Sequence, residues 1–178
     1  MKTIYTALLA LAISIASISK AQSLSDLSTV GSQTSNKATS RGNQGDPNIS
    51  VSDKALYQQA LAAQNSRQFK KAADLYLKLS QQTKSARFKS LSYRMAGSMY
   101  AIHGNLLIQL GRGAEAVPFL TKAASMGEIG AYTILGTMYY AGQGVAPNPQ
   151  KTIEYYRKGA RLGEPNAQQA LRSLGLRW

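Results

Sequence analysis

Two segments of this chain recur further along it in the same order. Residues 92–100 match residues 131–139 at an offset of 39 residues, and residues 119–128 match residues 155–164 at an offset of 36 residues. Ordered repetition at such a period is typical of a helix–turn–helix unit stacked on copies of itself, because one unit cannot bury its apolar face alone. The self-similarity therefore predicts an array of stacked helix pairs.

Apolar residues after position 53 follow the three- and four-residue spacing of amphipathic helices, and no stretch shows the two-residue alternation of strands. We therefore expect an all-α domain over 51–178. Its expected parts are helix pairs at 53–85, 88–126 and 128–163, followed by a C-terminal capping helix over 164–178. Three apolar stripes mark the helices: Leu56, Ala60 and Ala63; Phe69, Ala72, Ala73, Tyr76 and Leu79; and Phe88, Leu91, Met95, Met99, Ile102, Leu106 and Leu110.

Residue types that begin and end helices stand at the borders of these units. Asn148-Pro149 is typical of a helix start, with Asn as the N-cap and Pro at the first helical position. Gly127 and Gly163 fit the left-handed position just past a helix end. Gly142 and Gly144 are expected to supply the sharp reversal between two paired helices, because glycine adopts positive φ without strain.

Two glycines and one proline fall inside expected helices. In a helix interior, glycine costs about 1 kcal/mol of helix stability relative to alanine. We therefore expect a tyrosine of a neighbouring helix to pack against the missing side chain at both Gly97 and Gly136. Pro118 lies early in its helix, and a proline in a helix interior costs about 3 kcal/mol or more. We expect that helix to start late or to kink at Pro118.

The 128–163 unit resembles the Sel-one-like repeat, a relative of the tetratricopeptide repeat, and the likeness extends into the first helix of the next unit. Its motif runs Ala131-x-x-x-Leu135-Gly136-x-x-Tyr139-x-x-Gly142-x-Gly144-Val145, then Lys151, then Tyr155-Tyr156-x-Lys158-x-Ala160-x-x-Gly163. Upstream, Asn65-x-x-x-Phe69-x-x-Ala72-x-x-x-Tyr76 is similar to the second half of a tetratricopeptide repeat. The 88–126 unit departs from the pattern, because its first helix is too long and it has no Gly-x-Gly-Val reversal.

This resemblance implies a short right-handed α-solenoid of stacked antiparallel helix pairs, whose inner groove binds a peptide or a protein. It also implies that Tyr139, Tyr155 and Tyr156 occupy core positions of the repeat. Many secreted members of the family join each repeat by a cysteine pair. This chain has no cysteine, so packing alone must hold its repeats together.

The first 50 residues have a different composition. Lys2, the apolar run Ile4–Ile18 and the small residues around Ala21 form the pattern of a secretory signal peptide over 1–21. A retained membrane anchor is the alternative, although a spanning helix needs about 20 apolar residues. Residues 22–50 are rich in Ser, Thr, Asn and Gly and are expected to form a disordered tether. We expect a periplasmic or secreted protein that does not span the membrane after cleavage.

The helical domain is strongly basic. Residues 53–178 contain 17 Lys and Arg against 6 Asp and Glu, and no acid lies between Asp74 and Glu115. Such a field attracts acidic partners, although the alternative is a solvated face that serves only solubility. The candidate partner-binding residues are Lys84, Arg87, Lys89, Arg94, Tyr93 and Tyr132. Lys84, Arg87 and Arg94 share one face if the longest helix reaches Lys84, and the two tyrosines are expected to face the groove.

The residues offer little for catalysis. Without cysteine there is no thiolate nucleophile or thiolate metal site, and Glu115, Glu128, Glu154 and Glu164 are spread over separate units. The single histidine, His103, lies beside an apolar stripe and is interpreted as structural. We therefore expect no catalytic residue, no cofactor and no metal.

Three functions remain open. The first is a non-enzymatic interaction scaffold or adaptor in the bacterial envelope, with an acidic protein as partner. The second is an inhibitor or immunity-type protein that caps an enzyme. The third is a binder of an anionic envelope component such as cell wall or lipopolysaccharide. Nucleic acid is disfavoured as a partner, because no motif that reads it is present.

Overall fold

The computed structural model describes residues 46–178, which contain seven helices and no strand. The expectation of an all-α domain is confirmed for this part of the chain. The expected signal peptide at 1–21 lies outside the described residues, and so does the expected tether at 22–50 apart from residues 46–50. Residues 48–178 form one compact unit.

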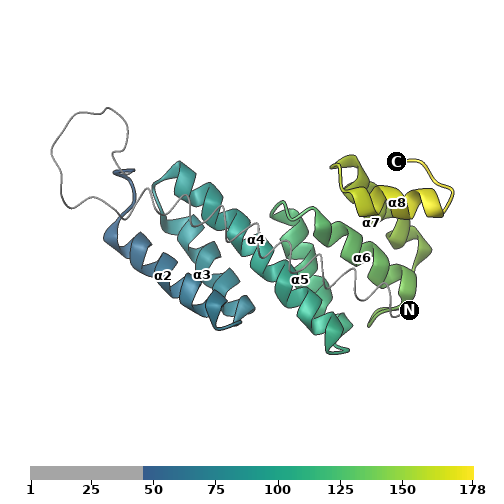
Figure 1. The fold of residues 1–178 in the computed structure, drawn as a ribbon, viewed down its shortest axis with the longest axis horizontal. Helices are drawn as coiled ribbons and strands as arrows, with labels where there is room; N and C mark the ends of the chain where they lie inside the picture. The colour runs from purple at the N-terminus through teal and green to yellow at the C-terminus, as the bar shows by residue number, and fades with distance from the viewer. Residues whose placement is uncertain (1–45) are drawn as a thin grey trace. The chain divides into compact units, whose positions relative to one another are not determined.

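Each helix packs against the next one along the chain, and α6 also contacts α8 (Figure 1). Three consecutive helix pairs are formed by α2 with α3, α4 with α5, and α6 with α7, and α8 is the C-terminal helix. Their bounds are α2 (Val51–Asn65), α3 (Phe69–Gln82), α4 (Ala86–Gln109), α5 (Gly113–Ser125), α6 (Gly130–Ala141), α7 (Pro149–Arg161) and α8 (Pro165–Ser173).

Asp53 connects the start of α2 to the end of α3. Ser50 Oγ accepts a hydrogen bond from Asp53 N (3.0 Å), and the Asp53 carboxylate accepts one from Ser50 N (3.0 Å), which completes a capping box. The same buried carboxylate accepts hydrogen bonds from Thr83 and Gln82. Burial raises the pKa of Asp53, but these hydrogen bonds together hold it below its ordinary value.

The turn between α6 and α7 uses the residues expected of it. Gly142 and Gly144 have φ values of 68° and 73°, in the left-handed region that glycine favours. Asn148 Oδ1 accepts a hydrogen bond from Lys151 N (2.9 Å), and Pro149 occupies the first position of α7. The expected left-handed glycines at 127 and 163 are confirmed as well.

The repeated apolar positions form the core of the last two units. Ala131 and Leu135 on α6 are fully buried, and so are their counterparts on α8, Ala167 and Leu171. Between them α7 contributes one buried tyrosine. The resulting cluster contains Tyr156, Ala160, Ala167 and Leu171.

The two helical glycines are both close-packing positions, but against different residues. A Cβ on Gly136 would lie 2.6 Å from the Tyr156 ring, which confirms the expected tyrosine. At Gly97 the neighbour is Met126, whose Cβ would lie 3.0 Å away, so the expectation of a tyrosine there is wrong. In the 88–126 unit, the end of α5 approaches α4 closely at this point and no ring lies against Gly97.

The last two residues of the third apolar stripe are exposed, so the expectation that they belong to the core is wrong. Leu106 and Leu110 are 37% and 61% exposed, whereas Gly104 and Leu107 are buried. A Cβ on Gly104 would lie 2.8 Å from Cγ of Leu120. The second half of α4 therefore turns its core face toward α5, which leaves Leu106 and Leu110 at the surface.

Pro118 lies inside α5, which begins at Gly113, so the expected late start of this helix is wrong, while the alternative of a kink at Pro118 stays a prediction. A proline at this position gives up the hydrogen bond to the carbonyl four residues back, that of Ala114. Both Pro118 and Ala114 lie at the exposed side of the helix, where water can solvate that carbonyl. The loss is therefore limited to one solvated hydrogen bond.

Candidate partner-binding face

The four basic residues singled out from the sequence are all exposed at the start of α4 or just before it. The helix begins at Ala86, because Ser85 Oγ caps it by accepting a hydrogen bond from Phe88 N (3.1 Å). Lys84 therefore lies in the connection after α3, and the condition for one helical face holding Lys84, Arg87 and Arg94 is not met. Arg87 and Arg94, two turns apart on α4, share a face.

The two tyrosines singled out with them occupy equivalent positions on α4 and α6. Tyr93 is 41% exposed. Tyr132 is half-buried, and a Cβ on Gly159 of α7 would lie 3.3 Å from its Cβ. Tyr132 therefore packs against α7.

Two aromatic pairs recur at equivalent positions in successive units. Tyr100 of α4 stacks on Phe119 of α5, with ring centroids 6.1 Å apart and planes at 21°. Tyr139 of α6 stacks on Tyr155 of α7 at 5.7 Å and 10°. The offsets of 39 and 36 residues that relate these pairs are those of the sequence repeat. The repeat therefore duplicates an aromatic stack between the two helices of the pair α4 and α5 and of the pair α6 and α7.

These stacks correct the expected core positions of the repeat. Tyr156 is buried, but Tyr139 and Tyr155 are only half-buried. Consecutive residues of a helix point about 100° apart, so α7 cannot bury Tyr155 and Tyr156 against the same neighbour. Tyr155 instead joins Tyr139 in a stack that solvent can reach.

Each stack carries lysine ammonium groups over a ring. Lys122 Nζ lies 4.3 Å from the Tyr100 centroid, Lys151 Nζ lies 4.8 Å from that of Tyr139, and Lys158 Nζ lies 5.6 Å from that of Tyr155. Such cation–π contacts contribute about 0.5–1 kcal/mol at exposed sites. We define the lysine–aromatic face as Phe119, Lys122, Tyr139, Lys151, Tyr155 and Lys158, which are half-buried or exposed, and the buried Tyr100 supports it from within the fold.

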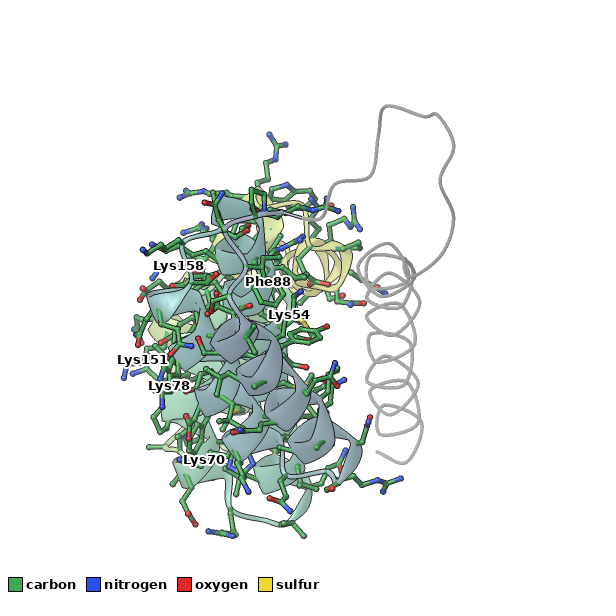
Figure 2. All side chains as sticks on the ribbon, turned by 90° about the vertical axis from the view of Figure 1, so that its left-hand side faces the viewer. Lys54, Lys70, Lys78, Phe88, Lys151 and Lys158 are labelled. Carbon is green, nitrogen blue, oxygen red and sulfur yellow. The ribbon has the colours of Figure 1, made fainter. Side chains whose placement is uncertain are left out.

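The lysines follow the repeat as well. Lys122 and Lys158 are equivalent at the 36-residue offset, and Lys78 occupies the matching place on α3, two residues after the buried Tyr76 as Lys158 is after the buried Tyr156. Figure 2 shows Lys70, Lys78, Lys151 and Lys158 along one side of the unit. The second helices of the three pairs therefore present a row of exposed lysines.

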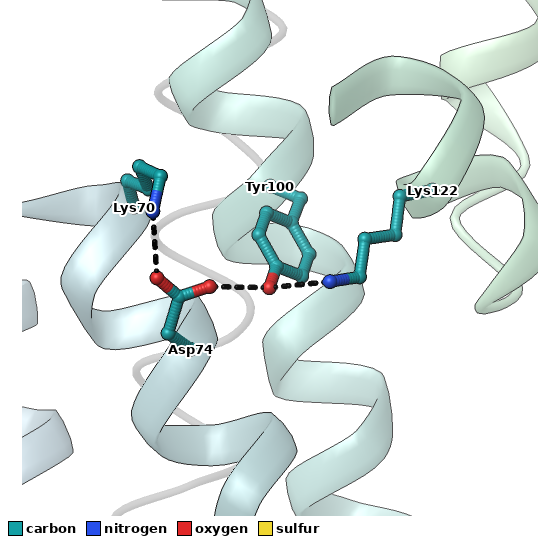
Figure 3. A network of polar contacts seen from close by, with 4 residues as sticks. All are labelled: Lys70, Asp74, Tyr100 and Lys122. Carbon is teal, nitrogen blue, oxygen red and sulfur yellow. Dashed lines mark hydrogen bonds and ion pairs between the residues drawn. The ribbon is translucent and has the colours of Figure 1, made fainter. Parts of the chain in front are cut away.

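A chain of polar contacts holds the first stack in place (Figure 3). Lys70 Nζ lies 2.9 Å from Asp74 Oδ2, the Tyr100 hydroxyl donates to Asp74 Oδ1 (2.5 Å), and Lys122 Nζ donates to the Tyr100 hydroxyl (2.8 Å). Burial, followed by the bond to Asp74 and its charge, raises the pKa of Tyr100, which stays a donor. The network joins α3, α4 and α5 and orients the Lys122 ammonium group.

The Asp74 carboxylate stays ionised within this network. Burial raises its pKa, but the hydrogen bonds from Tyr100 and Lys70 and the charges of Lys70 and Lys122 outweigh that effect and hold the pKa below its ordinary value. Asp74 therefore serves as the anionic anchor of three cationic or donor groups, and the surface around it remains positive.

A pocket of about 550 Å³ opens between α3 and α4, next to this network. Phe69, Leu75 and Leu106 supply its apolar wall, and the network residues Lys70 and Asp74 also line it. The remaining charged and polar lining comprises Arg67, Gln68, Lys71, Lys78 and His103. The pocket is thus an apolar hollow rimmed mostly by cations.

The pKa of His103 reflects the charges that surround this pocket. It meets Phe119 edge-on, with centroids 4.7 Å apart. Burial lowers its pKa, the charges of Lys70 and Arg112 lower it further, and Asp74 acts in the opposite direction. Sequence reasoning interpreted His103 only as structural and passed over α3, although the run Arg67, Lys70, Lys71 and Lys78 was visible in the sequence.

The glutamates have individual structural contacts. Glu115 pairs with Arg112 and Glu154 with Lys158, both at 2.6 Å. Glu164 caps α8 by accepting from Ala167 N (2.6 Å), and burial raises the pKa of Glu128. Within residues 46–178, no group of three His, Cys, Asp or Glu side chains is placed to hold a metal ion. No helix in that range has the length and apolar character to cross a membrane.

Comparisons with known proteins add no relative. No protein-family model, curated protein or solved structure matches the chain. The resemblance to Sel-one-like repeats therefore depends on the motif residues of 128–163 and on how they pack.

Proposed function

We propose that this protein is a non-enzymatic scaffold or adaptor, which binds an acidic segment of a partner protein across the lysine–aromatic face. The proposal includes the fold type: α2–α8 form a short right-handed α-solenoid of the Sel-one-like and tetratricopeptide type. Its support is that three helix pairs follow one another with each helix packed on the next, and that Gly136 and Tyr156 meet at repeat positions.

The observation that carries the proposal is the duplication of a surface cluster. A core position recurs in repeats because packing demands it, and this explains the buried Tyr100. Phe119 with Lys122 and Tyr155 with Lys158, by contrast, recur at half-buried or exposed positions on successive units. Tyrosine is enriched among the few residues that contribute most of the binding energy at protein interfaces. Two such clusters on adjacent units suit an extended ligand that contacts both.

The geometry also favours binding at low entropic cost. A stacked tyrosine loses little rotamer freedom when a partner covers it, and a lysine already held over a ring has less freedom to lose than a free one. The surplus of lysines adds long-range attraction for carboxylates, which increases the association rate at low salt.

The proposal extends to location. We place the protein in the bacterial periplasm or outside the cell, because residues 1–21 have the composition of a signal peptide. Proteins and anionic wall or lipid polymers both occur there, and a row of lysines attracts either. The aromatic stacks favour the protein partner, since two rigid apolar surfaces add little to the binding of a purely ionic polymer.

Affinity capture from an envelope extract tests the proposal. The baits are the unaltered protein, a Lys122→Glu/Lys158→Glu variant and a Lys54→Glu/Lys89→Glu variant with the same change in net charge. Lys54 and Lys89 are exposed on α2 and α4, outside the lysine–aromatic face. Circular dichroism of all three establishes that each is folded.

We expect one acidic protein to be retained by the unaltered protein and by the Lys54/Lys89 variant, and lost from the Lys122/Lys158 variant. Retention of lipopolysaccharide or wall fragments in place of a protein would contradict the proposal and support the alternative function, the binding of an anionic envelope polymer. Loss of the partner from the Lys54/Lys89 variant alone would place binding at the start of α4.

A further inference from the structure

Arg67 is the only non-glycine residue with positive φ among residues 46–178, at φ 57°. It directly follows Ser66, the C-cap of α2, and Gln68 N donates to Ala63 O in the closing turn. The positions just past the ends of α4, α5, α7 and α8 also have positive φ, and all of them are glycine: Gly111, Gly127, Gly163 and Gly175. An arginine there is strained, because its Cβ crowds the backbone in the left-handed region.

The strained arginine lines the pocket between α3 and α4. Residues in disfavoured backbone conformations cluster at ligand sites, where the side chain they supply outweighs the strain. Glycine would satisfy the fold at position 67, as it does at the other four helix ends. The conformation at position 67 therefore does not itself call for an arginine side chain.

We propose that the pocket between α3 and α4 is an anchoring subsite for an apolar side chain of an acidic peptide, with Arg67 as its specificity-determining residue. This inference rests on the proposed function and adds to it the place where a partner segment is anchored. Phe69, Leu75 and Leu106 cover the apolar side chain, while Arg67, Lys71 and Lys78 pair with flanking carboxylates.

The exposure of the apolar wall favours a ligand that covers it. Leu106 is 37% exposed and lies at the surface because α4 turns its core face toward α5. An exposed leucine beside Phe69 and Leu75 in a hollow is favourable to cover, since burial of apolar surface stabilises by about 25 cal/mol per Å². The cations at the rim select acidic neighbours for the side chain that enters.

Continuity with the lysine–aromatic face favours a polypeptide over a lipid. Asp74 and Lys70 line the pocket, and Asp74 also accepts the hydrogen bond from Tyr100, whose ring begins the first aromatic stack. His103, which also lines the pocket, meets the half-buried Phe119 of the face, so the pocket adjoins the lysine–aromatic face. An extended peptide can follow both, whereas a lipid headgroup fills only the pocket.

The chain provides its own reporter of occupancy. His103 is its single histidine, so one imidazole resonance follows the pocket in an NMR spectrum. Lys70 and Arg112 face it with positive charge and Asp74 with negative charge. Carboxylates that enter the pocket stabilise the imidazolium form and raise the pKa of His103.

The experiment is a titration of the full chain with blocked pentapeptides, followed by NMR of the His103 imidazole. The first peptide has leucine between two pairs of glutamates, the second has serine in place of leucine, and the third has glutamines in place of the glutamates. We expect the first peptide to raise the pKa of His103, and the other two to bind at least about fivefold more weakly.

The variant Arg67→Gly separates this role from a structural one. We expect it to weaken binding of the leucine–glutamate peptide at least about fivefold, because a charge-assisted hydrogen bond is lost. Its melting temperature should stay level or rise, because glycine relieves the strain at φ 57°. The control Lys54→Gly, far from the pocket lining, should leave peptide affinity unchanged.

Several results would overturn the inference. A peptide whose binding depends on Lys122 and Lys158 but leaves His103 unshifted refutes the pocket and leaves the proposed function standing. No binding by any acidic peptide counts against both. Phosphatidylglycerol vesicles that shift His103 in an Arg67-dependent way, where the peptides do not, make the occupant a lipid and refute the peptide. Normal peptide affinity in Arg67→Gly removes the role of Arg67.

Discussion

The ring of Tyr156 fills the space that a side chain at Gly136 would occupy, since a Cβ there would lie 2.6 Å from two of its ring atoms. The contact joins α6 to α7 within one repeat. It explains why a helix-weakening glycine stands in the middle of α6, and it makes Gly136 a sensitive position for testing the packing of the repeat.

We predict that Gly136→Ala lowers stability by about 1–3 kcal/mol, because the added methyl overpacks the contact with Tyr156. Gly130→Ala in the same helix is the matched control, since its Cβ would have only Glu128 Oε1 within 4 Å, at 3.8 Å. That variant should not lower stability, because alanine favours a helix over glycine. Thermal melts by circular dichroism measure both, and equal melting temperatures would contradict the packing described.

The turn between α6 and α7 gives a second stability prediction. Gly142→Val should destabilise, because a β-branched residue resists φ 68° and its Cβ would lie 3.0 Å from Pro147. Val145→Gly in the same turn removes a side chain without creating that strain. Urea unfolding should rank Gly142→Val as the less stable of the two, and the reverse order would argue against the left-handed turn.

The hydroxyl of Tyr100 bridges Asp74 and Lys122, so its removal should break both hydrogen bonds and lower the stability of the fold. We predict that Tyr100→Phe lowers the free energy of unfolding by about 1–3 kcal/mol, the cost typical of a lost hydrogen bond to a charged group. Tyr139→Phe is the control at the equivalent position, where the hydroxyl lies 3.5 Å from Lys151 and is solvent-accessible. Similar losses in both variants would contradict a specific role of the bridge.

Glu128 supplies a prediction about pH. Burial raises its pKa above the ordinary value of 4.5, so the fold favours the protonated acid. The corresponding stability is present below the ordinary pKa and is lost as the pH rises through the folded pKa. We expect Glu128→Gln to unfold at higher urea than the unaltered protein at about pH 7, and the difference to vanish near pH 4. Glu115→Gln, exposed and paired with Arg112, should show no such gain.

Sequence reasoning located the helix pairs because two segments repeat and because glycines mark the turns. It also anticipated the contact at Gly136, since the unit around that residue is the most regular one. The contact at Gly97 was wrong because the divergent 88–126 unit brings Met126 there, and the identity of a packing neighbour depends on how α5 approaches α4.

The candidate site was harder to predict. The pairing of Tyr139 with Tyr155 depends on the rotation of α7, which buries Tyr156 and leaves its neighbour at the surface. The equivalence of Lys78 with Lys122 is hidden because α3 and α5 share few other residues. Arg67 could not be recognised at all, because nothing in the sequence distinguishes a left-handed arginine from an ordinary one.

The association rate between the protein and its acidic partner, measured by surface plasmon resonance, determines whether the lysine–aromatic face governs binding. The measurement compares the unaltered protein with the Lys122→Glu/Lys158→Glu and Lys54→Glu/Lys89→Glu variants at low and high salt, about 50 and 300 mM. We predict that reversal of Lys122 and Lys158 slows association at low salt, that the defect shrinks at high salt, and that the Lys54/Lys89 variant is affected much less. Equal association rates for the two variants would show that general basicity, and not the lysine–aromatic face, governs binding.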